Sequence, residues 1–148
     1  MLLALWCPLW CWAQTSAALT AVTPQKLQIR AGETVEAKLH LRLGPGYHVN
    51  SNTPSDEFLI PLRVSWEASP LETMAIVYPK GHLEKYSFSE KPLSVYTGDF
   101  DVVTRFRVPK DAPKGARKVS GKVRYQACTA TVCYPPHTLT VELPVEIR

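Results

Sequence analysis

Cys128 and Cys133 lie close together within residues 125–138, which read YQACTATVCYPPHT. One alternating segment ends at Cys128 and another begins shortly after Cys133, so the four residues between them form a short loop that brings both thiols together. Closing so small a loop stabilises a fold by only about 2 kcal/mol in the chain-entropy model, and an accessible disulfide at a strand end is a labile one. Pro135 and Pro136 stiffen the exit from the loop. These features favour thiol–disulfide exchange over a purely structural disulfide.

Two other interpretations of the cysteine pair stay open. In the first, a structural disulfide only shapes a recognition loop, and the protein is a non-catalytic binding module. In the second, Cys128, Cys133 and His137 bind zinc with the spacing Cys-x4-Cys-x3-His, and His48 or His82 supplies the fourth ligand. Exported cysteines that can form disulfides seldom hold zinc, which argues against the second. A thioredoxin-like motif is excluded, because the spacing is not Cys-x-x-Cys and no βαβ pattern surrounds it.

Several side chains have both a functional and a structural interpretation. Tyr125 and Tyr134 flank the cysteines, so they shield a disulfide from small thiols or simply pack at a strand end. A protonated His137 favours a nearby thiolate, although an exposed loop position explains this histidine better. His48 is expected to be a strand residue with its hydrogen bonds satisfied, and Trp66 is expected to lie in the core.

The elements that position this loop are predicted from alternation with period two, the dominant signal after the first 25 residues. Apolar and polar residues alternate in four long segments, at residues 35–43, 100–108, 119–127 and 139–147. Shorter strands are expected at residues 26–30, 47–50, 62–66, 71–77 and 93–96. Eight or nine strands with turn signals between them, and no amphipathic helix, predict an all-β fold, an immunoglobulin-like antiparallel β-sandwich. The longest irregular segments, residues 51–57 and 78–92, are where function tends to lie.

The first residues form a separate unit, because every charged residue lies at or beyond Lys26. Residues 2–12 are almost wholly apolar and typical of an export signal, although no Lys or Arg precedes them. Two candidate cleavage sites are marked by small residues: Cys11 and Ala13, or Ser16 and Ala18. We therefore predict an export leader at residues 1–18 and one domain at residues 19–148.

Removal of the leader leaves Cys128 and Cys133 as the two cysteines of the mature chain, free to pair in the periplasm or another exported compartment. A length of 148 residues with 45% hydrophobic residues suits one domain with its own core. The net charge of +4 comes from interspersed residues rather than a basic stripe, which gives little support to nucleic-acid binding, and no nucleic-acid partner is expected. No apolar run is long enough for a membrane span, which excludes a membrane-embedded enzyme.

The segment YQACTATVCYPP resembles the active-site hairpin of the N-terminal domain of the DsbD family, the exported thiol:disulfide interchange reductases. Two further segments are similar to that family: PGYHVNSNTPSDEFLIPLRVSW at 45–66 and YPKGHLEKYSFSEKPLSVYTGDF at 78–100. The resemblance covers most of the chain and implies an immunoglobulin-like domain that shuttles electrons without a bound cofactor. It implies that Cys133 is the exposed sulfur that forms mixed disulfides, and that Cys128 is its resolving partner.

The resemblance also implies a cap and redox partners. Tyr86 or Phe88, within EKYSFSEK, matches the aromatic cap loop that covers the family's cysteines, although the acidic cap sequence is not reproduced. The spacing between the cysteines is one residue shorter than in well-known members. A membrane-embedded or thioredoxin-like reductant protein is expected to supply electrons to oxidised extracytoplasmic thiol proteins. Because the sequence ends at Arg148, without the family's other domains, the expected electron source is another polypeptide or another part of a longer chain.

Overall fold

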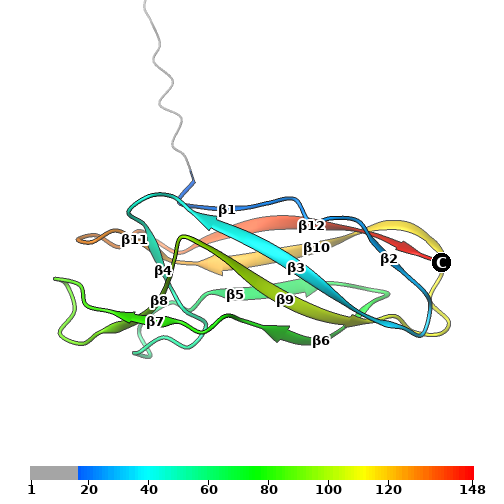
Figure 1. Ribbon diagram of the computed structural model, residues 1–148, viewed down its shortest axis with the longest axis horizontal. Helices are drawn as coiled ribbons and strands as arrows, with labels where there is room; N and C mark the ends of the chain where they lie inside the picture. The colour runs from blue at the N-terminus through cyan, green and yellow to red at the C-terminus, as the bar shows by residue number, and fades with distance from the viewer. Residues whose placement is uncertain (1–16) are drawn as a thin grey trace, which may run out of the picture.

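A computed structural model describes residues 17–148, and within this range the chain forms twelve β-strands and no helix (Figure 1). These residues therefore contain no helix that is long and apolar enough to span a bilayer. The candidate cleavage sites at Cys11, Ala13 and Ser16 lie outside the described residues, whereas Ala18 directly precedes the first strand and packs against the core.

Two four-stranded sheets form the body of the sandwich. The first has the order β1–β3–β9–β6, with β1 at Leu19–Ala21, β3 at Thr34–Leu43, β9 at Asp99–Arg107 and β6 at Glu72–Val77. The second has the order β2–β12–β10–β5, with β2 at Leu27–Ile29, β12 at His137–Ile147, β10 at Gly115–Tyr125 and β5 at Arg63–Glu67. Neighbouring strands are antiparallel in both sheets, except that β2 runs parallel to β12.

A third, smaller sheet lies at one end of the sandwich, at the left of Figure 1, and the C-terminus lies at the other end. Its order is β11–β4–β8–β7, with β11 at Ala127–Cys128, β4 at His48–Asn50, β8 at Leu93–Thr97 and β7 at His82–Glu84. All its strand pairs are antiparallel. Because β11 follows β10 after a single residue, this sheet continues the sandwich directly into the cysteine segment.

The alternation predicted from the sequence is confirmed in the long strands. In β10, Val119 and Val123 are buried, whereas Lys118 and Lys122 are exposed. Inward-facing residues of the two large sheets form two apolar clusters. The first, which we call the distal cluster, includes Ile29, Phe106, Val119, Leu143, Val145 and Ile147. The second extends toward the third sheet and includes Leu19, Leu41, Val49, Tyr96, Val123, Tyr125 and Ala127.

Trp66 was predicted to lie in the core, and the structure places it at the boundary, partly buried and packed against both clusters. Its ring meets that of Phe106 edge-on, with 5.6 Å between the centroids, and its Nε1 donates a hydrogen bond of 2.9 Å to Thr104 Oγ1. A Cβ atom at Gly121 would lie 2.6 Å from the indole ring. The absence of a side chain at Gly121 therefore leaves room for the indole to pack against β10.

The structure departs from the predicted strands in three respects. The sequence pattern missed β1, which lies before the region of regular alternation, and β7, which is only three residues long. β2 and β4 are equally short but match the strands predicted at residues 26–30 and 47–50. β7 lies within residues 78–92, which were expected to be irregular. The fold is not wholly antiparallel, because the chain crosses from the first sheet to the second between β1 and β2, and β2 then runs beside β12 in the same direction.

Candidate disulfide site

The two cysteines of the described chain form a disulfide that closes a short hairpin. The S–S distance is 2.08 Å and the two Cα atoms lie 4.0 Å apart. Backbone hydrogen bonds on both sides hold this hairpin: Thr129 N donates to Val132 O at 2.7 Å, and Tyr134 N donates to Ala127 O at 2.9 Å. The disulfide therefore joins the end of β11 to the segment that enters β12, as the alternation had indicated.

The two sulfur-bearing residues differ sharply in their access to solvent. Cys128 is 1% exposed, whereas Cys133 belongs to an exposed segment that runs to the start of β12. The difference follows from position, since Cys128 is paired within the third sheet and Cys133 lies beyond the hairpin tip. Of the two, Cys133 is the residue that another protein can approach first.

The pairing of the strands assigns Cys128 to a particular face of the third sheet. Cys128 lies opposite His48 in the β11–β4 pair, and Ala127 lies opposite Val49. Val49 and Ala127 point into the sandwich, where both belong to its apolar core. Because side chains alternate along a strand, and directly opposed residues share a face, Cys128 and His48 lie together on the outer face of this sheet.

Aromatic residues that follow β7 cover this outer face. The ring of Tyr86 stacks on that of His48, with 4.0 Å between the centroids and 13° between the planes. The Phe88 ring continues the stack at 5.5 Å from Tyr86. Ser87 Oγ donates a hydrogen bond of 3.5 Å to Ala130 O, in the loop between the cysteines. The segment matched to the cap loop is therefore in contact with the cysteine hairpin.

A carboxylate fixes the orientation of the Tyr86 ring. The hydroxyl of Tyr86 donates a hydrogen bond of 2.7 Å to Glu84 Oε2, and His82 Nε2 lies 3.0 Å from Glu84 Oε1. Burial and then the neighbouring carboxylate raise the pKa of Tyr86, so the phenol stays protonated and remains a donor. The same hydrogen bond is the main cause that lowers the pKa of Glu84 below its ordinary value.

His48 is the buried polar residue at the centre of this arrangement. It is 2% exposed, and its Nε2 atom has no hydrogen-bond partner among the described residues. Burial lowers the pKa of His48, and the opposing effect of Glu84 is smaller, so the imidazole is neutral at neutral pH. The prediction of a strand histidine is confirmed, but the prediction that its hydrogen bonds are satisfied is wrong, because stacking on Tyr86 leaves one nitrogen buried and unpaired.

The remaining candidate residues are dispersed around the hairpin. Tyr125 is buried in the core cluster, on the face opposite Cys128, because core packing takes up its ring. Tyr134 is exposed, with its ring centroid 6.2 Å from that of Tyr47. His137 is exposed at the start of β12 and meets the Tyr125 ring edge-on at 5.8 Å. Tyr134 thus lies beside the hairpin, whereas Tyr125 belongs to the core cluster beneath it.

Within residues 17–148, the side chains proposed as zinc ligands do not come together as a metal site. No group of three or more His, Cys, Asp or Glu residues there is arranged to hold a metal ion. Both cysteine sulfurs are already bonded to each other. The proposed fourth ligands are engaged elsewhere, since His48 stacks on Tyr86 and His82 lies at hydrogen-bond distance from Glu84.

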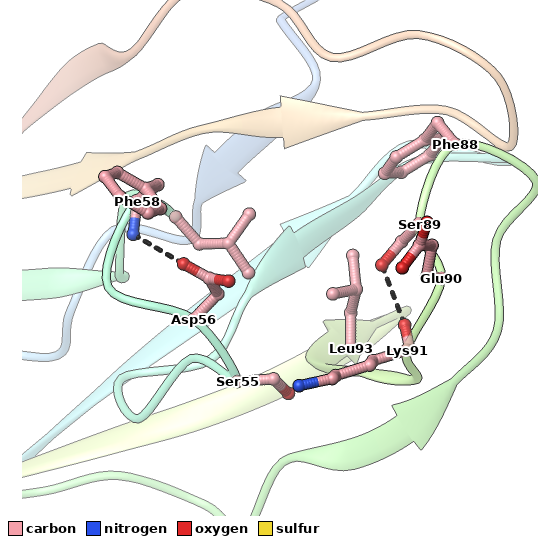
Figure 2. A pocket seen from close by; sticks show the side chains of 9 residues that line it. Ser55, Asp56, Phe58, Phe88, Ser89, Glu90, Lys91 and Leu93 are labelled. Atoms are coloured by element: carbon pink, nitrogen blue, oxygen red, sulfur yellow. Dashed lines mark hydrogen bonds between the residues drawn. The ribbon is translucent and has the colours of Figure 1, made fainter.

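A cavity of about 470 Å³ adjoins the aromatic cover, between the segment after β4 and the segment before β8 (Figure 2). Phe58 and Phe88 lie on opposite sides of it in Figure 2, and Leu93 lies between them. Hydrogen bonds fix the backbone on each side, from Phe58 N to Asp56 Oδ1 at 3.0 Å and from Ser89 Oγ to the carbonyl of residue 91 at 2.8 Å. Phe88 therefore belongs both to the aromatic stack and to the wall of this cavity.

Comparison with known proteins assigns the chain to a family. The family of thiol:disulfide interchange protein DsbD, N-terminal, matches residues 16–144, so the chain belongs to this family of thiol:disulfide interchange domains. The cysteine pair that such a domain needs is present and bonded. No curated protein matches the sequence.

Solved structures give the same fold at low sequence identity. The N-terminal periplasmic domain of ScsB from Proteus mirabilis is 14% identical with a TM-score of 0.55, and the match covers 84% of this chain and 44% of that one. The DsbD N-terminal domain of Neisseria meningitidis, in the reduced form, is 17% identical with a TM-score of 0.51, covering 78% and 82%. The chain thus spans less than half of the ScsB chain. These likenesses confirm the immunoglobulin-like β-sandwich.

Sequence reasoning missed the support of the aromatic cover, because Glu84 was not singled out and His82 was considered only as a zinc ligand. Glu84 and His82 carry no motif, and their roles depend on β7, a strand too short to detect. The sequence did carry a signal for His48, because it is an ionisable residue between Tyr47 and Val49 at the expected start of a strand. Its stacking on Tyr86, 38 residues later, required the fold.

Proposed function

We propose that this domain carries out thiol–disulfide exchange through Cys133 and Cys128, and passes electrons from a reductant protein to oxidised proteins outside the cytoplasm. The observation that carries the proposal is the unequal exposure of the bonded pair. Cys133 is exposed to solvent, whereas Cys128 is buried, with 1% of its surface exposed. An exchange reaction needs this asymmetry, because one sulfur must meet the partner and the other must stay close to resolve the product.

The proposed reaction begins with the reduced domain. The thiolate of Cys133 attacks one sulfur of an oxidised partner's disulfide, a new S–S bond joins the two proteins, and the partner's second sulfur leaves as a thiolate. Cys128 then attacks Cys133, which breaks the mixed disulfide and releases the first partner sulfur as a thiolate. The partner has gained two electrons and the domain is left with the Cys128–Cys133 disulfide. The cysteines carry both electrons, so the reaction uses no bound cofactor.

The cycle closes when a reductant protein attacks Cys133 and returns the two electrons. We propose a membrane-embedded or thioredoxin-like protein for this role, because such partners act in the family. Export to the periplasm or a similar compartment, with residues 1–18 as the leader, agrees with the periplasmic description of the similar ScsB domain. Tyr86 and Phe88, with Tyr134 beside the hairpin, are proposed to shield the disulfide from small thiols.

The reduction potential of the pair tests this function. The domain is equilibrated in graded thiol–disulfide buffers, its free thiols are alkylated, and the products are weighed. A midpoint between about −120 and −270 mV, the range of known exchange proteins, supports the proposal. A midpoint below about −300 mV is typical of structural disulfides and would replace exchange by the binding-module interpretation.

Cysteine variants separate the two proposed roles. With Cys128→Ser, we expect a stable mixed disulfide with an oxidised protein substrate, because the resolving sulfur is missing. With Cys133→Ser, we expect no mixed disulfide and no electron transfer, since Cys128 is buried. Non-reducing electrophoresis measures both. Equal trapping by the two variants would contradict the assignment of roles, and circular dichroism checks that each variant remains folded.

A further inference from the structure

His48 has a buried Nε2 with no hydrogen-bond partner among the described residues, and it lies directly opposite Cys128, the residue whose proton the proposed reaction must remove. His48 and Cys128 are directly opposed residues of an antiparallel strand pair, and their side chains share the outer face of the third sheet. Both are almost fully buried, at 2% and 1% exposed. Tyr86 closes the stack above the imidazole. The histidine is thus held beside the resolving cysteine, with little of its own surface exposed.

The chemistry of Cys128 changes when the disulfide is reduced. In the oxidised form its sulfur carries no hydrogen and cannot donate to the buried Nε2 of His48. Reduction creates an S–H group, which is a donor. A neutral imidazole with its proton on Nδ1 has Nε2 as an acceptor. The reduced state therefore supplies a donor to a nitrogen that has no partner in the oxidised state.

Resolution of the mixed disulfide requires more than a hydrogen bond, because the thiolate and not the thiol is the nucleophile. A thiol in apolar surroundings ionises with difficulty. Cys128 is 1% exposed, so a neighbouring protein group is better placed than bulk water to take the proton.

We infer that His48 accepts the thiol proton of Cys128 during resolution, an inference that rests on the proposed exchange function. The S–H bond of Cys128 breaks, its proton passes to Nε2 of His48, and the resulting thiolate attacks Cys133 of the mixed disulfide. The partner sulfur leaves as a thiolate. The imidazolium then gives up its proton to that thiolate or to water, which returns His48 to the neutral state.

The groups around His48 suit a transient positive charge. Glu84 acts on the imidazole through its negative charge, Tyr86 is a neutral phenol stacked on it, and His82 lies behind Glu84 at 3.0 Å. A second cavity, of about 430 Å³, is lined in part by His48, Glu84, Tyr86 and Ala130. This cavity gives the proton a route from the imidazole toward solvent, past the carboxylate.

A two-phase reaction with a chromogenic aromatic disulfide, dithiobis-nitrobenzoate, isolates the resolution step. Attack by Cys133 of the reduced domain releases one coloured thiol in the first phase, and resolution by Cys128 releases the second. Stopped-flow absorbance follows both across a pH series. For the wild type, we expect the rate of the second phase to hold through neutral pH and to fall only below about pH 6.5, the ordinary histidine pKa, because burial keeps His48 neutral.

His48→Phe keeps a ring to stack on Tyr86 but removes the nitrogen. We expect the second phase to slow on the order of 100-fold at neutral pH, the usual size of a lost general base. Its rate should then rise steadily with pH, because hydroxide must replace the imidazole, while the first phase is unchanged. The same substitution at the exposed His137, His137→Phe, is the matched control and should leave both phases unchanged.

Three results would overturn the inference or its basis. A second phase with the wild-type rate and pH profile in His48→Phe means that His48 takes no proton, and equal slowing of both phases means a general disturbance of the site. If His48→Phe does not fold, His48→Gln gives the same test with an amide that does not ionise. Release of only one coloured thiol per reduced wild-type domain would overturn the exchange function itself, which separates that failure from the failure of His48.

Discussion

The distal cluster and the third sheet lie at opposite ends of the sandwich, and they bury different kinds of residue (Figure 1). The distal cluster consists of apolar residues on long strands with regular alternation, and the buried polar Thr104 near it on β9 is paired with Trp66 Nε1. In the third sheet, His48, Asn50 and the following Ser51 are buried within a few residues of one another. Buried polar groups cost stability unless they are paired, so one end is suited to holding the fold and the other to chemistry.

The largest expected effect is on the distal cluster. Phe106 is fully buried there, so Phe106→Ala should lower the free energy of unfolding by about 3–5 kcal/mol through lost packing and a residual cavity. The exchange rate per folded molecule should not change. Urea unfolding and the chromogenic assay measure the two quantities. Phe58→Ala is the control, because a side chain 84% exposed should contribute less than about 0.5 kcal/mol. A changed exchange rate in Phe106→Ala would show that the distal cluster also affects the disulfide site, and would contradict the proposed division of roles between the two ends.

An intermediate effect is expected at the aromatic cover. Tyr86→Ala removes a stacked ring that stabilises the closed cover by about 0.5–1.5 kcal/mol. The disulfide should therefore be exposed roughly two to ten times more often than in the wild type. Reduction of the oxidised domain by a small thiol should accelerate by that factor, with little loss of stability. Tyr86→Phe keeps the ring but loses the hydrogen bond to Glu84, and should show a smaller increase. An unchanged rate in Tyr86→Ala would remove Tyr86 from the proposed shield.

The smallest expected effect is the pH dependence of stability in the oxidised domain. Burial lowers the pKa of His48 below 6.5, so on acidification the unfolded chain takes up this proton before the folded domain does. The stability linked to His48 is therefore complete above about pH 6.5 and is lost as the pH falls through the lowered pKa. Urea midpoints of the wild type should decline in this window relative to those of His48→Phe. Parallel curves for the two proteins would contradict a lowered pKa.

The sandwich body and the third sheet also differ in how well the sequence predicted them. The long strands of the sandwich body alternate regularly because one face packs in the core and the other meets water, as in Val119 and Lys118. Their strand positions and the β-sandwich followed from that pattern. The cysteine hairpin was also predictable, because β10 leads to Cys128 and Pro135 and Pro136 follow Cys133 closely.

The third sheet was predicted only in part: β4 and β8 match predicted strands and β11 falls at the end of the segment predicted at residues 119–127, whereas β7 is too short to show a pattern. The contact between His48 and Tyr86 joins residues far apart in the sequence, and no local pattern encodes it. Tyr125 shows the converse: it lies near the cysteines in the sequence, yet its ring belongs to the core. Proximity along the chain therefore identified the disulfide, whereas the residues around it depend on strand pairing.

The parallel pairing of β2 with β12 has a mechanical consequence. Residues 27–29 lie beside residues 145–147 with their directions aligned. Tension that pulls the N-terminal side of β2 away from the C-terminal end of β12 slides these two strands past each other, so their hydrogen bonds bear the load together instead of opening one by one. The same crossing from β1 to β2 ties both large sheets to one short stretch of chain. Under such a pull on β2 and β12, the resistance lies at the end that holds the distal cluster, opposite the disulfide.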